Sequence, residues 1–140
     1  MPSKIATVGV ERAHALTYFR KAGQLCEAAA AELGTERCDA TLILSIHAGI
    51  SAADAVCIGL GTRKNKDAHE RAADLLEEVG AHTGEFKENA NRLRTLLAAK
   101  NAIEYENKRA TRKDAEVGIR RCEALMSWAE KTLRKAKLVP

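Results

Sequence analysis

The most hydrophobic stretch of the chain, residues 36–60, places the strongest limit on its fold. Apolar residues recur there at the three- and four-residue spacings of an α-helix, and others widen this stripe: Leu42, Ile46, Gly49, Ala53, Val56 and Leu60, with Ile43, Ile50, Cys57 and Ile58. A helix that is apolar on most sides has to be surrounded by neighbours. We therefore expect this segment to be the central helix of a bundle.

Four further segments carry the one-sided apolar pattern of amphipathic helices, at about 11–33, 67–79, 85–107 and 112–136. The last begins with a capping-box pattern, Thr111 to Asp114, and residues 59–66 read as a loop. Both prolines, Pro2 and Pro140, lie at the ends, so neither interrupts a helix. The chain is thus predicted to be all-α: an antiparallel bundle of about five helices in one domain, residues 1–140, with its core at about 11–135.

Composition points to the cytosol and away from metal chemistry. We expect no membrane span and no signal peptide, because no run approaches about 18 apolar residues and residues 1–7 lack an apolar core. The four cysteines show no CxxC spacing and sit among apolar residues, which favours small buried hydrophobes over disulfides or metal ligands: Cys26, Cys38, Cys57 and Cys122. No HExxH motif, Gly-rich phosphate loop or metal-ligand cluster occurs, so we expect neither metal nor cofactor.

Charge is unevenly distributed. Residues 1–107 carry 13 Lys/Arg and 15 Asp/Glu, a net of −2, whereas residues 108–140 carry 10 and 4, a net of +6. A basic last helix can contact a nucleic acid, or it can simply present a solvated face.

Two sets of polar residues are candidates for a site: one lies along the central helix, and the other lies around the start of the helix predicted at 67–79. His47, Ser51 and Asp54 draw a polar line along the central helix, but the serine lies between the other two, whereas a hydrolase triad needs the histidine in the middle. This polar line could either hydrogen-bond to a neighbouring helix or form part of a ligand site. Arg63 and His69 could bind phosphate or move a proton, or they could be a surface loop and a packed histidine.

The helix at about 85–107 carries a core stripe that turns polar before the helix ends, at Lys100 and Glu104. These two are one turn apart and can form an ion pair. Asn101 and Tyr105 make a second one-turn pair beside them. Lysine can hold a phosphate and tyrosine can bond or stack with a base, so a structural and a functional interpretation both remain open here.

The helix order, the Ala-rich stretch 46–55, the His69…Leu75-Leu76 helix and the polar group before the last helix together resemble the HEPN superfamily of small helical bundles. RNases of that superfamily carry Arg, four to six residues, then His. Here Lys100 stands where arginine is expected, Asn101 matches, and Tyr105 falls at the histidine position. Arg63 and His69 keep a similar spacing but precede the third helix.

The resemblance implies a homodimer that binds or cleaves RNA, or binds a nucleotide, as a metal-independent endoribonuclease in a prokaryotic toxin–antitoxin or defence system with a partner antitoxin. Lys100, Asn101 and Tyr105 would be the catalytic positions, with weaker ligand contacts expected from Glu104, Asp54, His47, Arg63 and His69. The alternative is a non-catalytic dimeric interaction module, because tyrosine titrates too high for proton transfer at neutral pH.

Overall fold

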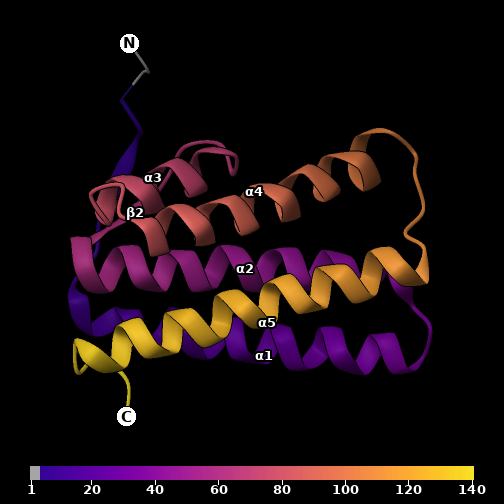
Figure 1. The fold of residues 1–140 in the computed structure, drawn as a ribbon, viewed down its shortest axis with the longest axis horizontal. Helices are drawn as coiled ribbons and strands as arrows, with labels where there is room; N and C mark the ends of the chain where they lie inside the picture. Colours follow the sequence, from indigo (N-terminus) through magenta and orange to yellow (C-terminus); the bar gives the residue numbers. More distant parts are fainter. Residues whose placement is uncertain (1–3) are drawn as a thin grey trace.

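The computed structural model describes residues 4–140 and consists mainly of five helices packed as a bundle (Figure 1). A short 3₁₀ turn, Arg12–His14, leads into the first helix. The helices are α1 (Ala15–Gly34), α2 (Cys38–Gly61), α3 (Arg71–Val79), α4 (Gly84–Tyr105) and α5 (Arg112–Lys135). The predicted all-α bundle is confirmed, and so is the Thr111–Asp114 capping box at the start of α5. Pro2 lies outside the described residues.

The central position of α2 is also confirmed. It contacts each of the other four helices, with α1 and α5 on one side and α3 and α4 on the other (Figure 1). Every residue from Ala48 to Gly59 is buried. At Gly49 a Cβ atom would lie 2.9 Å from Leu96 Cδ1 and 3.3 Å from Leu125 Cδ1, so the missing side chain lets α4 and α5 approach the middle of α2.

The burial of α2 accounts for its high apolar content, as the sequence predicted. Among the described residues, α2 is the helix that is long and apolar enough, by length and composition, to cross a membrane. Of its most apolar part, 83% is buried inside the bundle, as in the core helix of a soluble protein.

Two short strands differ from the prediction of a loop at residues 59–66. Helix α2 continues through Gly59 and ends at Gly61, and the residue that follows, Thr62, adopts a left-handed conformation with φ 51°. The strand β2 (Arg63–Asn65) then pairs antiparallel with β1 (Thr7–Gly9), with Thr7 opposite Asn65. The loop prediction is wrong at 63–65 because this pairing joins segments far apart in the sequence.

The third helix also begins later than predicted. Residues 67–70 form a turn instead of a first helical turn, held by the Asn65 side chain. Asn65 accepts a hydrogen bond from the backbone N–H of Asp67 at 3.0 Å and donates to the carbonyl of Ala68 at 3.2 Å. The Asp67 carboxylate accepts from the backbone N–H of Ala6 at 3.2 Å, which joins this turn to β1. The turn carries His69 toward α2.

Candidate functional site

A polar cavity of about 360 Å³ lies between α1, α2, strand β2 and the turn before α3. Its walls combine four basic or aromatic side chains from outside α2 with the polar line that runs along α2 itself. The lining residues are Tyr18, Lys21, Leu25, His47, Ile50, Ser51, Asp54, Lys64 and His69. Three residues predicted from the sequence therefore meet in one place: His47, Asp54 and His69.

The two histidines face each other across this cavity. Their ring centroids are 6.3 Å apart and their planes are nearly perpendicular, at 85°. Burial lowers the pKa of His47, and the neighbouring His69 and Lys100 lower it further, against an opposing effect of Glu104. His47 is therefore mainly neutral at pH 7, the state in which an imidazole can accept a proton.

Asp54 is the least expected group in the cavity. It is only 8% exposed, and it makes no hydrogen bond or ion pair within residues 4–140. Burial raises the pKa of its carboxyl group from 3.8 to about 7, although Lys64 and Lys21 attract the charged form and oppose this rise. The Asp54 carboxyl group lines the cavity. A mostly buried carboxyl group without a protein partner is costly to fold around, so it is available to bind a ligand there.

Two lysines give the cavity a positive edge. The Nζ atoms of Lys21 and Lys64 lie 5.7 and 5.5 Å from the centre of the Tyr18 ring, within the range of cation–π contacts. Our sequence reasoning missed these three residues. Tyr18, Lys21 and Leu25 sit three and four positions apart on one face of α1, a signal that was available. Lys64 gave no such signal, because it depends on the unpredicted strand.

Arg63 is not part of this cavity. Side chains alternate along a strand, so Arg63 and its neighbour Lys64 lie on opposite faces of β2. The Arg63 guanidinium pairs instead with the Glu78 carboxylate on α3 at 2.8 Å.

The predicted group at the end of α4 does not line the cavity, but the charges of Lys100 and Glu104 are close enough to act on His47. Lys100 and Glu104 form the expected ion pair at 2.9 Å, and the hydrogen bond from Glu104 raises the pKa of Lys100. The Lys100 ammonium also lies 5.9 Å from the Tyr105 ring, which is 74% exposed. Asn101 is half-buried. This group is thus a rim beside the histidines, and its tyrosine is open to solvent.

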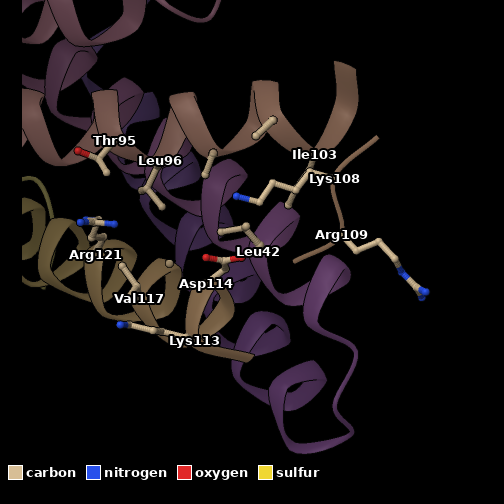
Figure 2. A pocket seen from close by; sticks show the side chains of 13 residues that line it. Leu42, Thr95, Leu96, Ile103, Lys108, Arg109, Lys113, Asp114, Val117 and Arg121 are labelled. Atoms are coloured by element: carbon tan, nitrogen blue, oxygen red, sulfur yellow. The ribbon is translucent and has the colours of Figure 1, made fainter. Parts of the chain in front are cut away.

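A second hollow, of about 200 Å³, lies on the other side of α4, against α2 and the start of α5 (Figure 2). Its apolar floor includes Leu42, Leu96, Ile103 and Val117, and its edge carries Lys108, Arg109, Lys113 and Arg121. Figure 2 shows Lys108 reaching toward the hollow and Arg109 extending away from it.

This second hollow offers charge but little acid–base chemistry. Its one carboxylate, on Asp114, accepts the backbone N–H of Thr111 in the capping box, and those hydrogen bonds lower its pKa. No histidine lines it. Within residues 4–140 no three His, Cys, Asp or Glu side chains gather as a metal site in either place. The polar cavity is therefore the stronger candidate for chemistry.

In a comparison with protein families, the sequence model of the HEPN domain matches residues 15–132. This range runs from the start of α1 to the last turns of α5, and it includes all the residues of the polar cavity. No curated protein and no solved structure matches the chain.

The unpaired Asp54 makes a prediction about stability. Its folded-state pKa is raised, so the free energy of unfolding should fall as pH rises from about 3.8 to about 7, by up to about 4 kcal/mol, and stay level above that. Asp54→Asn removes this titration. The variant should match the native protein below pH 4 and exceed its stability above pH 7, measured by urea unfolding across that range.

Asp114→Asn is the matched control, because the pKa of Asp114 is lowered by its backbone hydrogen bonds. That group stabilises the fold above its ordinary pKa and loses this effect as pH falls. Its substitution should therefore lower stability at neutral pH, the opposite sign. A difference between Asp54→Asn and native protein that does not change with pH would contradict the assignment.

Proposed function

Because the chain belongs to the HEPN domain family, we propose that its polar cavity binds RNA and cleaves the strand without a metal ion. HEPN domains are generally RNases of defence or toxin systems. The observation that carries the proposal is the convergence of His47, His69 and the unpaired Asp54 in one cavity edged by lysines. These groups supply a proton acceptor, a proton donor and phosphate-binding charge, which are the requirements of RNA cleavage by the 2′-hydroxyl.

In the proposed reaction, neutral His47 accepts the proton of a ribose 2′-hydroxyl. The 2′-oxygen attacks the adjacent phosphorus, and the bond from phosphorus to the 5′-oxygen breaks. His69 is the group that gives a proton to that leaving oxygen. The products are a 2′,3′-cyclic phosphate and a free 5′-hydroxyl, and the two histidines have exchanged protonation states.

The remaining cavity residues bind and position the strand. Lys21 and Lys64 stabilise the negative charge that builds up on the phosphate, as point charges at the cavity edge. The Asp54 carboxyl group lies deeper and bonds to donor groups of the nucleotide held there. This interaction compensates for its burial only when ligand is bound, which explains why it lacks a partner in the protein itself.

The rim at the end of α4 contacts the next nucleotide. Lys100 holds a neighbouring phosphate, Asn101 bonds to the ribose or base, and the exposed Tyr105 ring offers a stacking surface. This role does not require Tyr105 to transfer a proton, so the tyrosine at the family's histidine position is compatible with an active enzyme whose histidines come from α2 and the turn before α3.

Cleavage of mixed short RNAs tests the proposal. His47→Gln and His69→Gln should each slow cleavage by about 10²–10⁴-fold, because each removes one proton-transfer group. Lys64→Gln should weaken it less, whereas Tyr105→Phe, which keeps the ring, should leave it nearly unchanged. The assay should detect the cyclic phosphate end.

Lys87→Gln on the exposed part of α4 is the charge-matched control and should cleave like the native protein. If the native protein neither cleaves nor binds any of the RNAs, the proposal is wrong and the interaction module is favoured. If it cleaves but both histidine variants retain full activity, the site is wrong.

We propose also that the chain is a homodimer, as HEPN domains often are, with the two cavities sharing one RNA and an antitoxin protein as a further partner. The native protein should have the mass of two chains in light scattering at micromolar concentration. A monomer mass there would contradict the dimer.

A further inference from the structure

Two thiols from the first and last helices lie in contact. Cys26 on α1 and Cys122 on α5 are 96 residues apart in the sequence, yet their Sγ atoms are only 3.1 Å apart. A disulfide bond has an S–S length of about 2.05 Å. The two sulfurs therefore need to approach by only about 1 Å to become bonded. The other two cysteines, Cys38 and Cys57, have no such partner within residues 4–140.

The two sulfurs differ in exposure and in pKa, and these differences indicate which one reacts first with an oxidant. Cys122 is fully buried, whereas Cys26 is partly exposed on α1. The hydrogen bond between the two thiols lowers the pKa of Cys26 and is the largest influence on it, exceeding the opposing effect of burial. A thiolate is the reactive form of cysteine. Cys26 is both the more exposed sulfur and the one with the lowered pKa, so it is the sulfur that reacts with a soluble oxidant. Cys57, by contrast, is buried, and burial raises its pKa.

We propose that Cys26 and Cys122 form an oxidation site at which hydrogen peroxide converts the thiol pair into a disulfide between α1 and α5. The Cys26 thiolate attacks a peroxide oxygen, the O–O bond breaks, and the released hydroxide takes up a proton as water. Cys26 is then a sulfenic acid. The Cys122 thiol gives up its proton and its sulfur attacks the Cys26 sulfur. The S–O bond breaks and a second water leaves.

The bond would connect α1 and α5, two helices that pack against each other and against α2. It joins α1, which supplies Tyr18, Lys21 and Leu25 to the polar cavity, to α5, which packs beside it. A cross-link over 96 residues removes much of the freedom of the unfolded chain. The site stands on its own geometry, so it does not depend on whether the cavity cleaves RNA.

Peptide mapping of peroxide-treated native protein tests the proposal. Trypsin should release the two cysteines in separate peptides, residues 22–37 and 122–131, each with one cysteine. After treatment with hydrogen peroxide and blocking of free thiols, mass spectrometry should find these two peptides joined, lighter than their sum by two hydrogen atoms. Dithiothreitol should separate them. The oxidised protein should also melt on the order of 10 °C higher than the reduced one.

Two single variants serve as a matched pair. Cys38→Ser leaves the thiol pair intact and should still form the cross-link, whereas Cys26→Ser should lose both the joined peptides and the rise in melting temperature. The proposal is overturned if the native protein shows Cys26 oxidised to sulfinic acid, or unmodified, with no joined peptide. It is overturned equally if peroxide joins Cys38 or Cys57 in preference to this pair.

Discussion

The fold depends on the burial of α2. A helix in contact with four others can present almost nothing polar without a partner, and twelve consecutive residues, Ala48 to Gly59, are buried. Asp54 lies within that stretch, so its carboxyl group has to be neutralised, paired or offered to a ligand. The β1–β2 pair and the turn before α3 leave a cavity beside this part of α2. The polar line along α2 is therefore accommodated because it lines a cavity and does not pack against an apolar helix.

The helices were predictable because their cause is local. Apolar spacing placed all five, and the Thr111 hydroxyl with the Asp114 carboxylate correctly indicated where the last one starts. The β1–β2 pairing was not predictable, since its strands have three residues each and meet only after the bundle forms. This also limited what could be predicted of the site. Without β2, nothing in the sequence indicated that Lys64 and His69 lie beside α2.

The polar cavity lies within the part of the chain that the family comparison matches. The HEPN match covers residues 15–132, while the expected Arg and His positions hold Lys100 and Tyr105. Tyr105 is exposed and Lys100 is paired with Glu104. The histidines available for proton transfer stand next to this rim, on α2 and the turn before α3. In our account the residues at the end of α4 occupy the family's motif position and bind RNA. The acid–base groups are His47 on α2 and His69 in the turn before α3.

The central claim is that RNA binds in the polar cavity between the two histidines. NMR titration of the histidine ring signals with a 2′-O-methyl RNA, which can bind but has no free 2′-hydroxyl to attack, tests it most directly. The account predicts that the His47 and His69 signals shift together as RNA is added, and that the pKa of His47 rises when phosphate lies beside it. Unchanged ring signals, with shifts confined to the basic residues around the second hollow, would contradict it.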